Sequence, residues 1–427
     1  MAIDTPNWVK SAVIYEVFPR NHSADGMFMD IFGDLERIKS LHTDILWLMP
    51  IHPIGIAGRK GTLGSPYAVR DYRAVNPELG DPRTLQMVID KAHALGMKVI
   101  IDVVYNHTSR DSVLLREYPE WFLQDSEGNF ITKVPDWWDV YDLDYRRPDL
   151  WKYQIETLEQ WVDFGVDGFR CDVAPLVPLD FWCTARERLA HKKEVIWLAE
   201  SIEKSFVKYM RDRGYRAYAD PQLHAAFDLT YDYDGFEYLK DYFQGKRPLS
   251  DYLNHLYIQE TLYPEDAVKL RFLENHDNPR AADVIRGRDS LLNWTVFYTL
   301  LPGATLVHAG QEIGATKTPN LFEKDPVNWK DADVELMSFM QEVLGIAKDI
   351  KSVCTKFAVR ELAEGVVKLT WLGEGISYVA LLNLGNKYGE VHVDGLSEAE
   401  VCLGDAGSDM RTFRIERMPI LMKISAA

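Results

Sequence analysis

Cysteine is scarce in this sequence, with four residues among 427, at positions 171, 183, 354 and 402. Their spacing matches neither a zinc site nor a dense disulfide framework, which excludes the small disulfide-stabilised proteins of oxidising compartments. No apolar run approaches the roughly 20 residues that a membrane-spanning helix requires. The first six residues contain neither a basic leader nor an apolar segment. We therefore expect a protein of the reducing cytoplasm with no membrane partner.

Positive charge is also in short supply. The 48 lysines and arginines are outnumbered by 65 aspartates and glutamates, which gives a net charge of −17. Such a chain repels nucleic acid and anionic membranes, so neutral or cationic partners fit it better. Hydrophobic residues make up 47% and charged residues 26%, as in an ordinary globular protein rather than a disordered or fibrous one.

Eight short apolar or β-branched runs recur along the chain, each followed by a helical pattern. Runs of this length without alternation are typical of parallel strands that are buried on both faces. No glycine-rich dinucleotide fingerprint follows an early strand, so the pattern favours a (β/α)8 TIM barrel over an open doubly wound sheet. The runs are Ala12–Phe18, Ile45–Leu48, Lys98–Val103, Val166–Arg170, Val195–Leu198, Ala225–Leu229, Val268–Leu273 and Ala304–His308.

One connecting helix has clear end signals. Asp81 can cap its start, Pro82 suits the first helical position, and Gly96 follows its end. Apolar residues between them recur at helical spacing and predict the buried face. They are Leu85, Val88, Ile89 and Ala92.

Two stretches depart from the barrel pattern. Residues 107–145 are rich in charged and aromatic side chains and predict an insertion after the third strand, on the face where barrels build their sites. Beyond residue 352 the helical patterns stop, and short strand-like runs predict a C-terminal all-β sandwich domain over residues 353–427. The barrel itself is then formed by residues 1–106 and 146–352. The predicted C-terminal strands are Val366–Trp371, Ser377–Leu382, Glu390–Val393 and Ile420–Ile424.

Polar residues stand at the carboxyl ends of four predicted strands, where barrel enzymes place their catalytic groups. Asp102 lies inside its strand and is better placed to orient a neighbour than to attack a substrate. Asn106 is either a turn former or a calcium ligand, or both. The four segments are Ile101-Asp102-Val103-Val104-Tyr105-Asn106-His107, Gly168-Phe169-Arg170-Cys171-Asp172, Trp197-Leu198-Ala199-Glu200 and Phe272-Leu273-Glu274-Asn275-His276-Asp277.

These four segments resemble, in this order, the signature motifs of the α-amylase family of glycoside hydrolases, and the resemblance runs from about Ala12 to the end of the chain. Chance matching of all four is negligible. Further matches are Ser65-Pro66-Tyr67-Ala68-Val69-Arg70-Asp71-Tyr72, Asp142-Leu143-Asp144 and Gly310-Gln311-Glu312.

The resemblance implies a retaining mechanism with a covalent intermediate. Asp172 matches the nucleophile, Glu200 the acid/base and Asp277 the carboxylate that stabilises the transition state. Arg170 lies two residues before Asp172 on the same strand face, where it would keep that aspartate ionised.

The resemblance also assigns substrate-binding residues. His107 and His276 match histidines that bind hydroxyls of the cleaved sugar, and Tyr67 matches an aromatic platform for the apolar face of that sugar. From the residues alone, both histidines could equally be satisfied core residues. Trp137 and Trp138 in the insertion are further candidates for sugar binding.

One departure from the family concerns the residues after the nucleophile. Many relatives that cut within chains carry a Lys-His pair three and four residues beyond it, which assists leaving-group sugars and calcium. This chain has Pro175 and Leu176 instead. We expect weak recognition of leaving-side sugars, with a structural calcium ion at Asn106 as the single cofactor and no organic cofactor.

These observations predict a cytoplasmic enzyme of carbohydrate metabolism, a glycosidase that hydrolyses α-1,4 bonds in soluble maltodextrins and starch fragments. The alternative is a transglycosylase or isomerase with the same triad, such as a glucanotransferase or a trehalose-forming enzyme. A proline beyond the nucleophile is also found in the trehalose-forming isomerases. A catalytically silent carbohydrate-binding or interaction protein is the third alternative, although the intact triad disfavours it. The sequence predicts no oligomeric state.

Overall fold

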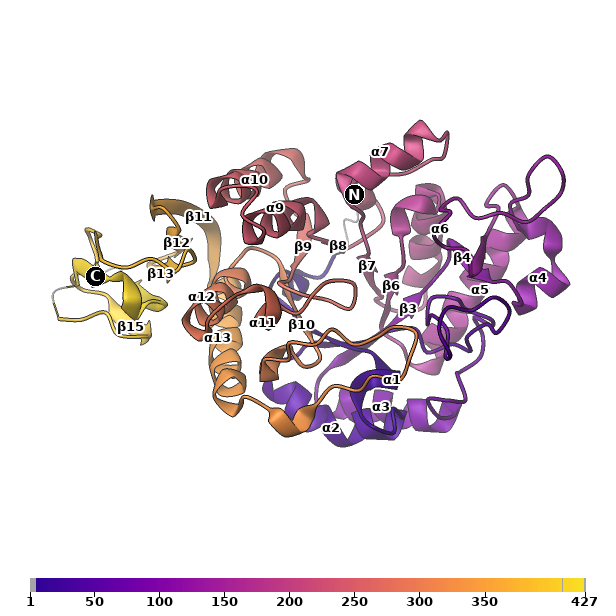
Figure 1. Ribbon diagram of the computed structural model, residues 1–427, viewed down its shortest axis with the longest axis horizontal. Coiled ribbons are helices and arrows are strands. Elements are labelled where there is room, and N and C mark those ends of the chain that lie inside the picture. Colours follow the sequence, from indigo (N-terminus) through magenta and orange to yellow (C-terminus); the bar gives the residue numbers. More distant parts are fainter. Residues whose placement is uncertain (1–4, 409, 426–427) are drawn as a thin grey trace.

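The computed structural model describes residues 5–408 and 410–425. Its centre is a closed barrel of eight parallel strands in the order β1-β10-β9-β8-β7-β6-β3-β2 (Figure 1). This confirms the predicted TIM barrel. The barrel strands are β1 (Val13–Val17), β2 (Ile45–Leu48), β3 (Lys98–Val103), β6 (Gly168–Cys171), β7 (Ile196–Ala199), β8 (Leu229–Tyr231), β9 (Val268–Arg271) and β10 (Ala304–His308).

One predicted barrel strand was wrong. Residues 225–228 form a turn, and β8 begins only at Leu229. The Asp228 carboxylate accepts a hydrogen bond from the backbone N–H of Trp197 at 2.8 Å and one from the guanidinium of Arg186 at 2.6 Å. These bonds fix a polar residue at the start of the strand, so the apolar run before it is a connection rather than a strand.

Helices follow the barrel strands and surround them (Figure 1). In α3, Asp81 accepts the backbone N–H of Thr84, and the four predicted apolar residues are buried, which confirms the predicted helix. The helices are α1 (Pro19–His22), α2 (Phe28–Ser40), α3 (Pro82–Ala94), α4 (Val113–Glu117), α5 (Pro148–Phe164), α6 (Leu179–Ala190), α7 (Lys204–Asp212), α8 (Asp220–Leu223), α9 (Tyr233–Phe243), α10 (Leu249–Leu262), α11 (Ala281–Val284), α12 (Arg288–Thr299) and α13 (Val334–Val353).

The segment after β3 is a small insertion in the barrel, and it contains α4 and a two-stranded antiparallel sheet. That sheet pairs β4 (His107–Ser109) with β5 (Val140–Asp142). The register pairs His107 with Asp142, so the start of the insertion lies beside its end.

The C-terminal part is all-β and lies at the opposite end of the molecule from α4 (Figure 1). A five-stranded antiparallel sheet has the order β11-β12-β13-β17-β15, and β14 pairs with β16. Apolar side chains of both sheets share one core, among them Leu381 and Phe413. The strands are β11 (Cys354–Ala363), β12 (Val366–Gly373), β13 (Ile376–Asn383), β14 (Glu390–His392), β15 (Glu400–Leu403), β16 (Thr412–Arg414) and β17 (Ile420–Ser425).

Two tryptophans attach this part to the barrel. The indole N–H of Trp294 in α12 donates to the Leu384 carbonyl at 3.2 Å, and that of Trp371 in β12 donates to the Leu300 carbonyl at 2.8 Å. Within the described residues, no helix combines the length and apolar character needed to cross a membrane.

Candidate active site

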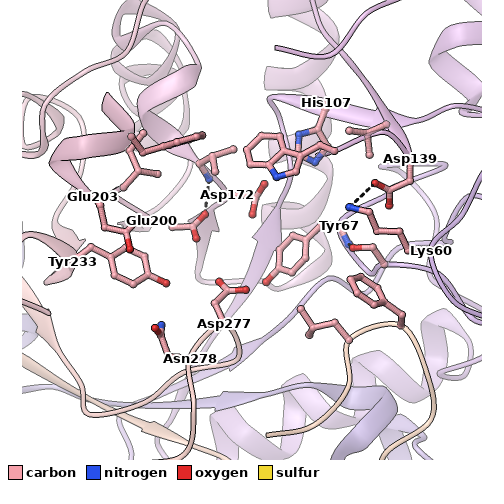
Figure 2. A pocket seen from close by; sticks show the side chains of 18 of the residues that line it. Lys60, Tyr67, His107, Asp139, Asp172, Glu200, Glu203, Tyr233, Asp277 and Asn278 are labelled. Atoms are coloured by element: carbon pink, nitrogen blue, oxygen red, sulfur yellow. Dashed lines mark hydrogen bonds and ion pairs between the residues drawn. The ribbon is translucent and has the colours of Figure 1, made fainter. Parts of the chain in front are cut away.

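A cavity of about 480 Å³ lies at the carboxyl ends of the barrel strands, within the size range of small-molecule sites. Its wall includes five of the predicted site residues, namely Tyr67, His107, Asp172, Glu200 and Asp277 (Figure 2). Strand ends explain this convergence. Asp172 directly follows β6 and Glu200 directly follows the adjacent β7, so parallel register brings the two carboxylates to the same rim.

Arg170, in β6, is the centre of the polar network beneath the cavity and is fully buried. Its Nη1 donates to Oδ1 of Asp172 at 2.8 Å and to Oδ1 of Asp102 at 2.9 Å. Its Nη2 lies 3.1 Å from Oε1 of Glu200, within ion-pair distance but off the axis of a hydrogen bond. One guanidinium therefore joins three buried carboxylates.

The residue after Asp172 has an uncommon backbone conformation. Val173 lies in the left-handed region with φ of +35°, which is strained for a β-branched residue. In this conformation its N–H donates to Oε2 of Glu200 at 2.7 Å. The strained residue thus holds the Glu200 carboxylate through a backbone hydrogen bond next to Asp172 in sequence.

Burial and mutual repulsion control the protonation of this pair. Burial raises the pKa of Asp172 well above the usual range, the charge of Glu200 raises it further, and Arg170 opposes both. Burial likewise raises the pKa of Glu200, with Arg170 opposing. The two carboxyls therefore titrate as a pair that keeps one proton to higher pH than isolated carboxyls would. Of these two carboxyls, only Asp172 accepts a hydrogen bond from the charged Arg170 guanidinium, whereas Glu200 accepts one from the neutral Val173 N–H. The charged donor stabilises a carboxylate more strongly, which favours the charge on Asp172 and the proton on Glu200.

His276 connects Asp277 to the barrel interior. Its Nδ1 contacts the Glu16 carboxylate in β1, and its Nε2 lies 3.1 Å from Asp277 and 2.7 Å from the Tyr67 hydroxyl. Burial disfavours the imidazolium, but the charges of Asp277 and Glu16 outweigh burial and raise the pKa of His276 well above its usual value. Burial would also raise the pKa of Asp277, and His276 reverses this and lowers it. The pair is therefore an imidazolium beside an ionised aspartate, whose side chain is 39% exposed.

Glu16 was missed in the sequence analysis. It is completely buried in β1, and every other residue of that strand is apolar or tyrosine. A single carboxylate in an otherwise apolar strand was the sequence signal that could have identified Glu16 as a candidate site residue.

His107 is held on the opposite side of the cavity. The Asn106 amide donates to its Nδ1 at 3.1 Å, and the Trp137 ring lies 5.4 Å from its ring. Burial lowers the pKa of His107, so its ring is neutral near pH 7. Trp137 lines the cavity, whereas Trp138 is 51% exposed and is not part of its wall. Only one of the two candidate tryptophans therefore faces the site.

The cavity has two distinct ends (Figure 2). Glu203 and Tyr233 lie near Glu200 (Figure 2), so this end offers a charged and an aromatic group. At the other end, beyond Tyr67, Lys60 and Asp139 form an ion pair of 3.0 Å that bridges the loop after β2 and the insertion. None of these residues was singled out from the sequence, because none belongs to a recognisable motif.

Comparison with known proteins gives consistent results. A family model described as the α-amylase catalytic domain matches residues 17–120 and 116–358. The chain is similar to an α-amylase from Lactobacillus plantarum of known structure, with 41% identity and a TM-score of 0.93, over 98% of this chain and 100% of that one. It is also similar to the noncanonic maltogenic α-amylase AmyB from Thermotoga neapolitana, with 33% identity and a TM-score of 0.86 over the same shares.

A more distant relative is the α-amylase MalA from Haloarcula japonica, 25% identical over 90% of this chain. The chain spans only 57% of the length of that relative. The matching region is therefore common to proteins of different overall size.

Proposed function

Because this chain belongs to the α-amylase family of glycoside hydrolases, we propose that it hydrolyses α-1,4-glucosidic bonds in soluble maltodextrins with retention of configuration. The observation that carries the proposal is the contact of one buried guanidinium with Asp172 and Glu200 at the ends of adjacent strands. Retaining glycosidases need two carboxyl groups close together, one as nucleophile and one as acid/base. The names of the maltogenic and other α-amylases that resemble the chain support a glucan substrate.

In the first step, Asp172 attacks the anomeric carbon. Arg170 holds Oδ1 of that carboxylate, which leaves Oδ2 for attack. The bond from the anomeric carbon to the leaving oxygen breaks, and Glu200 transfers its proton to that oxygen. The sugar is then an ester of Asp172, and Glu200 is a carboxylate.

The second step reverses these roles. Glu200 takes a proton from water, the water oxygen attacks the anomeric carbon, and the ester bond to Asp172 breaks. Both carboxyls return to their starting states. Because each step inverts the anomeric carbon, the product keeps the configuration of the substrate.

Asp277 and His276 stabilise the transition state of each step. An ionised Asp277 can accept hydroxyl hydrogen bonds that strengthen as positive charge develops on the ring. The imidazolium of His276 keeps it ionised, and the neighbouring Tyr67 ring offers an apolar surface to the sugar.

Transfer to a sugar hydroxyl instead of water uses the same residues. The products of a substrate panel distinguish the two reactions. We expect maltooligosaccharides to give shorter maltodextrins as the main products, with little change in trehalose or sucrose. Longer glucans, or trehalose formed from maltose, would show that transfer or isomerisation is the main activity.

The proposal also includes a cytoplasmic location, supported by the four cysteines, none of which is in a disulfide in the described residues.

A further inference from the structure

A buried lysine lies at the place where the sequence predicts a calcium ion. Lys133 belongs to the insertion, and its side chain is 9% exposed. Its ammonium donates to Oδ1 of Asn106 at 2.5 Å and to the Leu176 carbonyl at 3.5 Å. It also lies 3.5 Å from Oδ2 of Asp142, whose side chain is completely buried.

The three oxygens come from three separate parts of the chain. Asn106 follows barrel strand β3, Asp142 is the last residue of β5 in the insertion, and Leu176 lies in the segment after the nucleophile. The lysine thus joins the insertion, the barrel and the loop beyond Asp172. A bound cation that bridges chain segments would have the same effect.

The residues do not fit a calcium ion in addition to this lysine. Calcium takes roughly six to eight oxygen ligands at about 2.3–2.6 Å. Here the Asn106 oxygen is already 2.5 Å from an ammonium, and the Asp142 carboxylate is balanced by the lysine charge. Asp142 also accepts the Lys133 backbone N–H at 3.0 Å. Among the described residues, no group of three or more histidine, cysteine, aspartate or glutamate side chains could hold a metal.

We propose that the Lys133 ammonium replaces a structural cation and that the enzyme attaches its insertion to the barrel without calcium. The attachment reaches the cavity through one further contact. The Lys133 ammonium binds the amide oxygen of Asn106, and the amide nitrogen of the same residue binds Nδ1 of His107. Lys133 is therefore a positioning residue for His107.

Calcium titration tests the first half of the proposal. Purified enzyme treated with EDTA and then titrated with CaCl2 should give no one-site binding heat, and its unfolding temperature should be the same in calcium and in EDTA. One calcium per chain, with an unfolding temperature that rises on binding as mass action requires, would overturn it.

Substitution tests the second half. Lys133→Met keeps the length of the side chain and removes its charge, whereas Lys133→Arg keeps a cation. We expect Lys133→Met to make residues 107–145 at least tenfold more sensitive to limited proteolysis and to raise KM about tenfold with a smaller change in kcat. Lys133→Arg should restore most of both properties.

The matched control is Lys193→Met, because Lys193 also pairs with a buried aspartate, Asp167, at 3.3 Å, but far from the insertion in sequence. This control should change neither proteolysis of residues 107–145 nor KM. Unchanged proteolysis in Lys133→Met would overturn the proposal. If that variant fails to fold, a Lys133→Arg enzyme without calcium dependence supports the proposal, and one that requires calcium contradicts it. The calcium and proteolysis measurements do not depend on which glucan is cleaved, so they are independent of the proposed function.

Discussion

Replacement of Arg170 by leucine should destabilise the barrel in a strongly pH-dependent way. Arg170 is the cation shared by Asp102, Asp172 and Glu200, and its side chain and that of Asp102 are completely inaccessible to solvent. Removing one partner of a buried ion pair costs about 3–5 kcal/mol, because the remaining charge is left without compensation. A typical total stability is about 5–15 kcal/mol, so the loss should be large but measurable.

The pH dependence follows from the carboxyl groups that the variant leaves behind. Burial already raises the pKa of Asp102 to about 6, and Arg170 opposes that rise. Without the guanidinium, the pKa of Asp102 in the folded state must rise further. A carboxyl with a raised folded-state pKa favours folding below its unfolded value near 4, and this contribution is lost as the pH rises through the folded-state value. The deficit relative to wild type should therefore be small near about pH 5 and largest near about pH 8.

Urea unfolding at the two pH values measures this deficit, followed both by tryptophan fluorescence and by circular dichroism because a two-part chain can unfold in steps. The matched control is Arg288→Leu, since Arg288 is 44% exposed and its ion pair with Asp333 lies at the surface. That variant should lose no more than about 1 kcal/mol at either pH. An Arg170→Leu deficit below about 1 kcal/mol at about pH 8, or one that is equal at both pH values, would refute the reasoning.

Three further predictions concern catalysis. Asp172→Asn should keep the fold and bind substrate but lose at least about a thousandfold in kcat, about 4 kcal/mol of barrier, because an amide cannot form the glycosyl ester; a smaller loss would exclude Asp172 as nucleophile. Glu200→Gln should retain activity on aryl glucosides with good leaving groups and form glycosyl azide when azide is added. It should also lose the fall in kcat/KM at high pH that deprotonation of Glu200 causes. Equal loss on natural and activated substrates would contradict the role of Glu200 as acid/base. Glu16→Gln should lower the pKa of His276, seen by NMR of the ring, and reduce kcat more than it raises KM; an unchanged ring titration would show that Glu16 does not hold the charge on His276.

Much of the barrel could be predicted because its strands are short, apolar and buried on both faces. Ile45–Leu48, Lys98–Val103 and Ala304–His308 agree with the structure to the residue. The sixth strand was wrong because hydrophobicity alone does not distinguish a buried turn from a buried strand, and Asp228 marks the boundary only through its hydrogen bonds. In the C-terminal part, β11, β15 and β16 were missed, since solvent reaches many of their side chains and interrupts the apolar pattern.

The candidate site was predictable where a residue lies next to a strand end or belongs to a motif that resembles the family's. The structure brings Tyr67, His107, Asp172, Glu200 and Asp277 to one cavity. Lys133 was not predictable, because it lies 27 positions from Asn106 in a loop without periodicity and only the folded insertion brings its ammonium to that amide.

The retaining mechanism at Asp172 is the central claim, and trapping the covalent intermediate tests it most directly. A fluorinated glucosyl fluoride should accumulate the ester. The fluorine on the sugar ring slows both formation and hydrolysis of the ester, whereas the good fluoride leaving group speeds formation alone. Peptide mass spectrometry of the inactivated enzyme should then find one sugar per chain, attached to Asp172 and absent from Asp172→Asn. A sugar attached to Glu200 or Asp277, or no adduct together with a first product of inverted configuration, would contradict the mechanism.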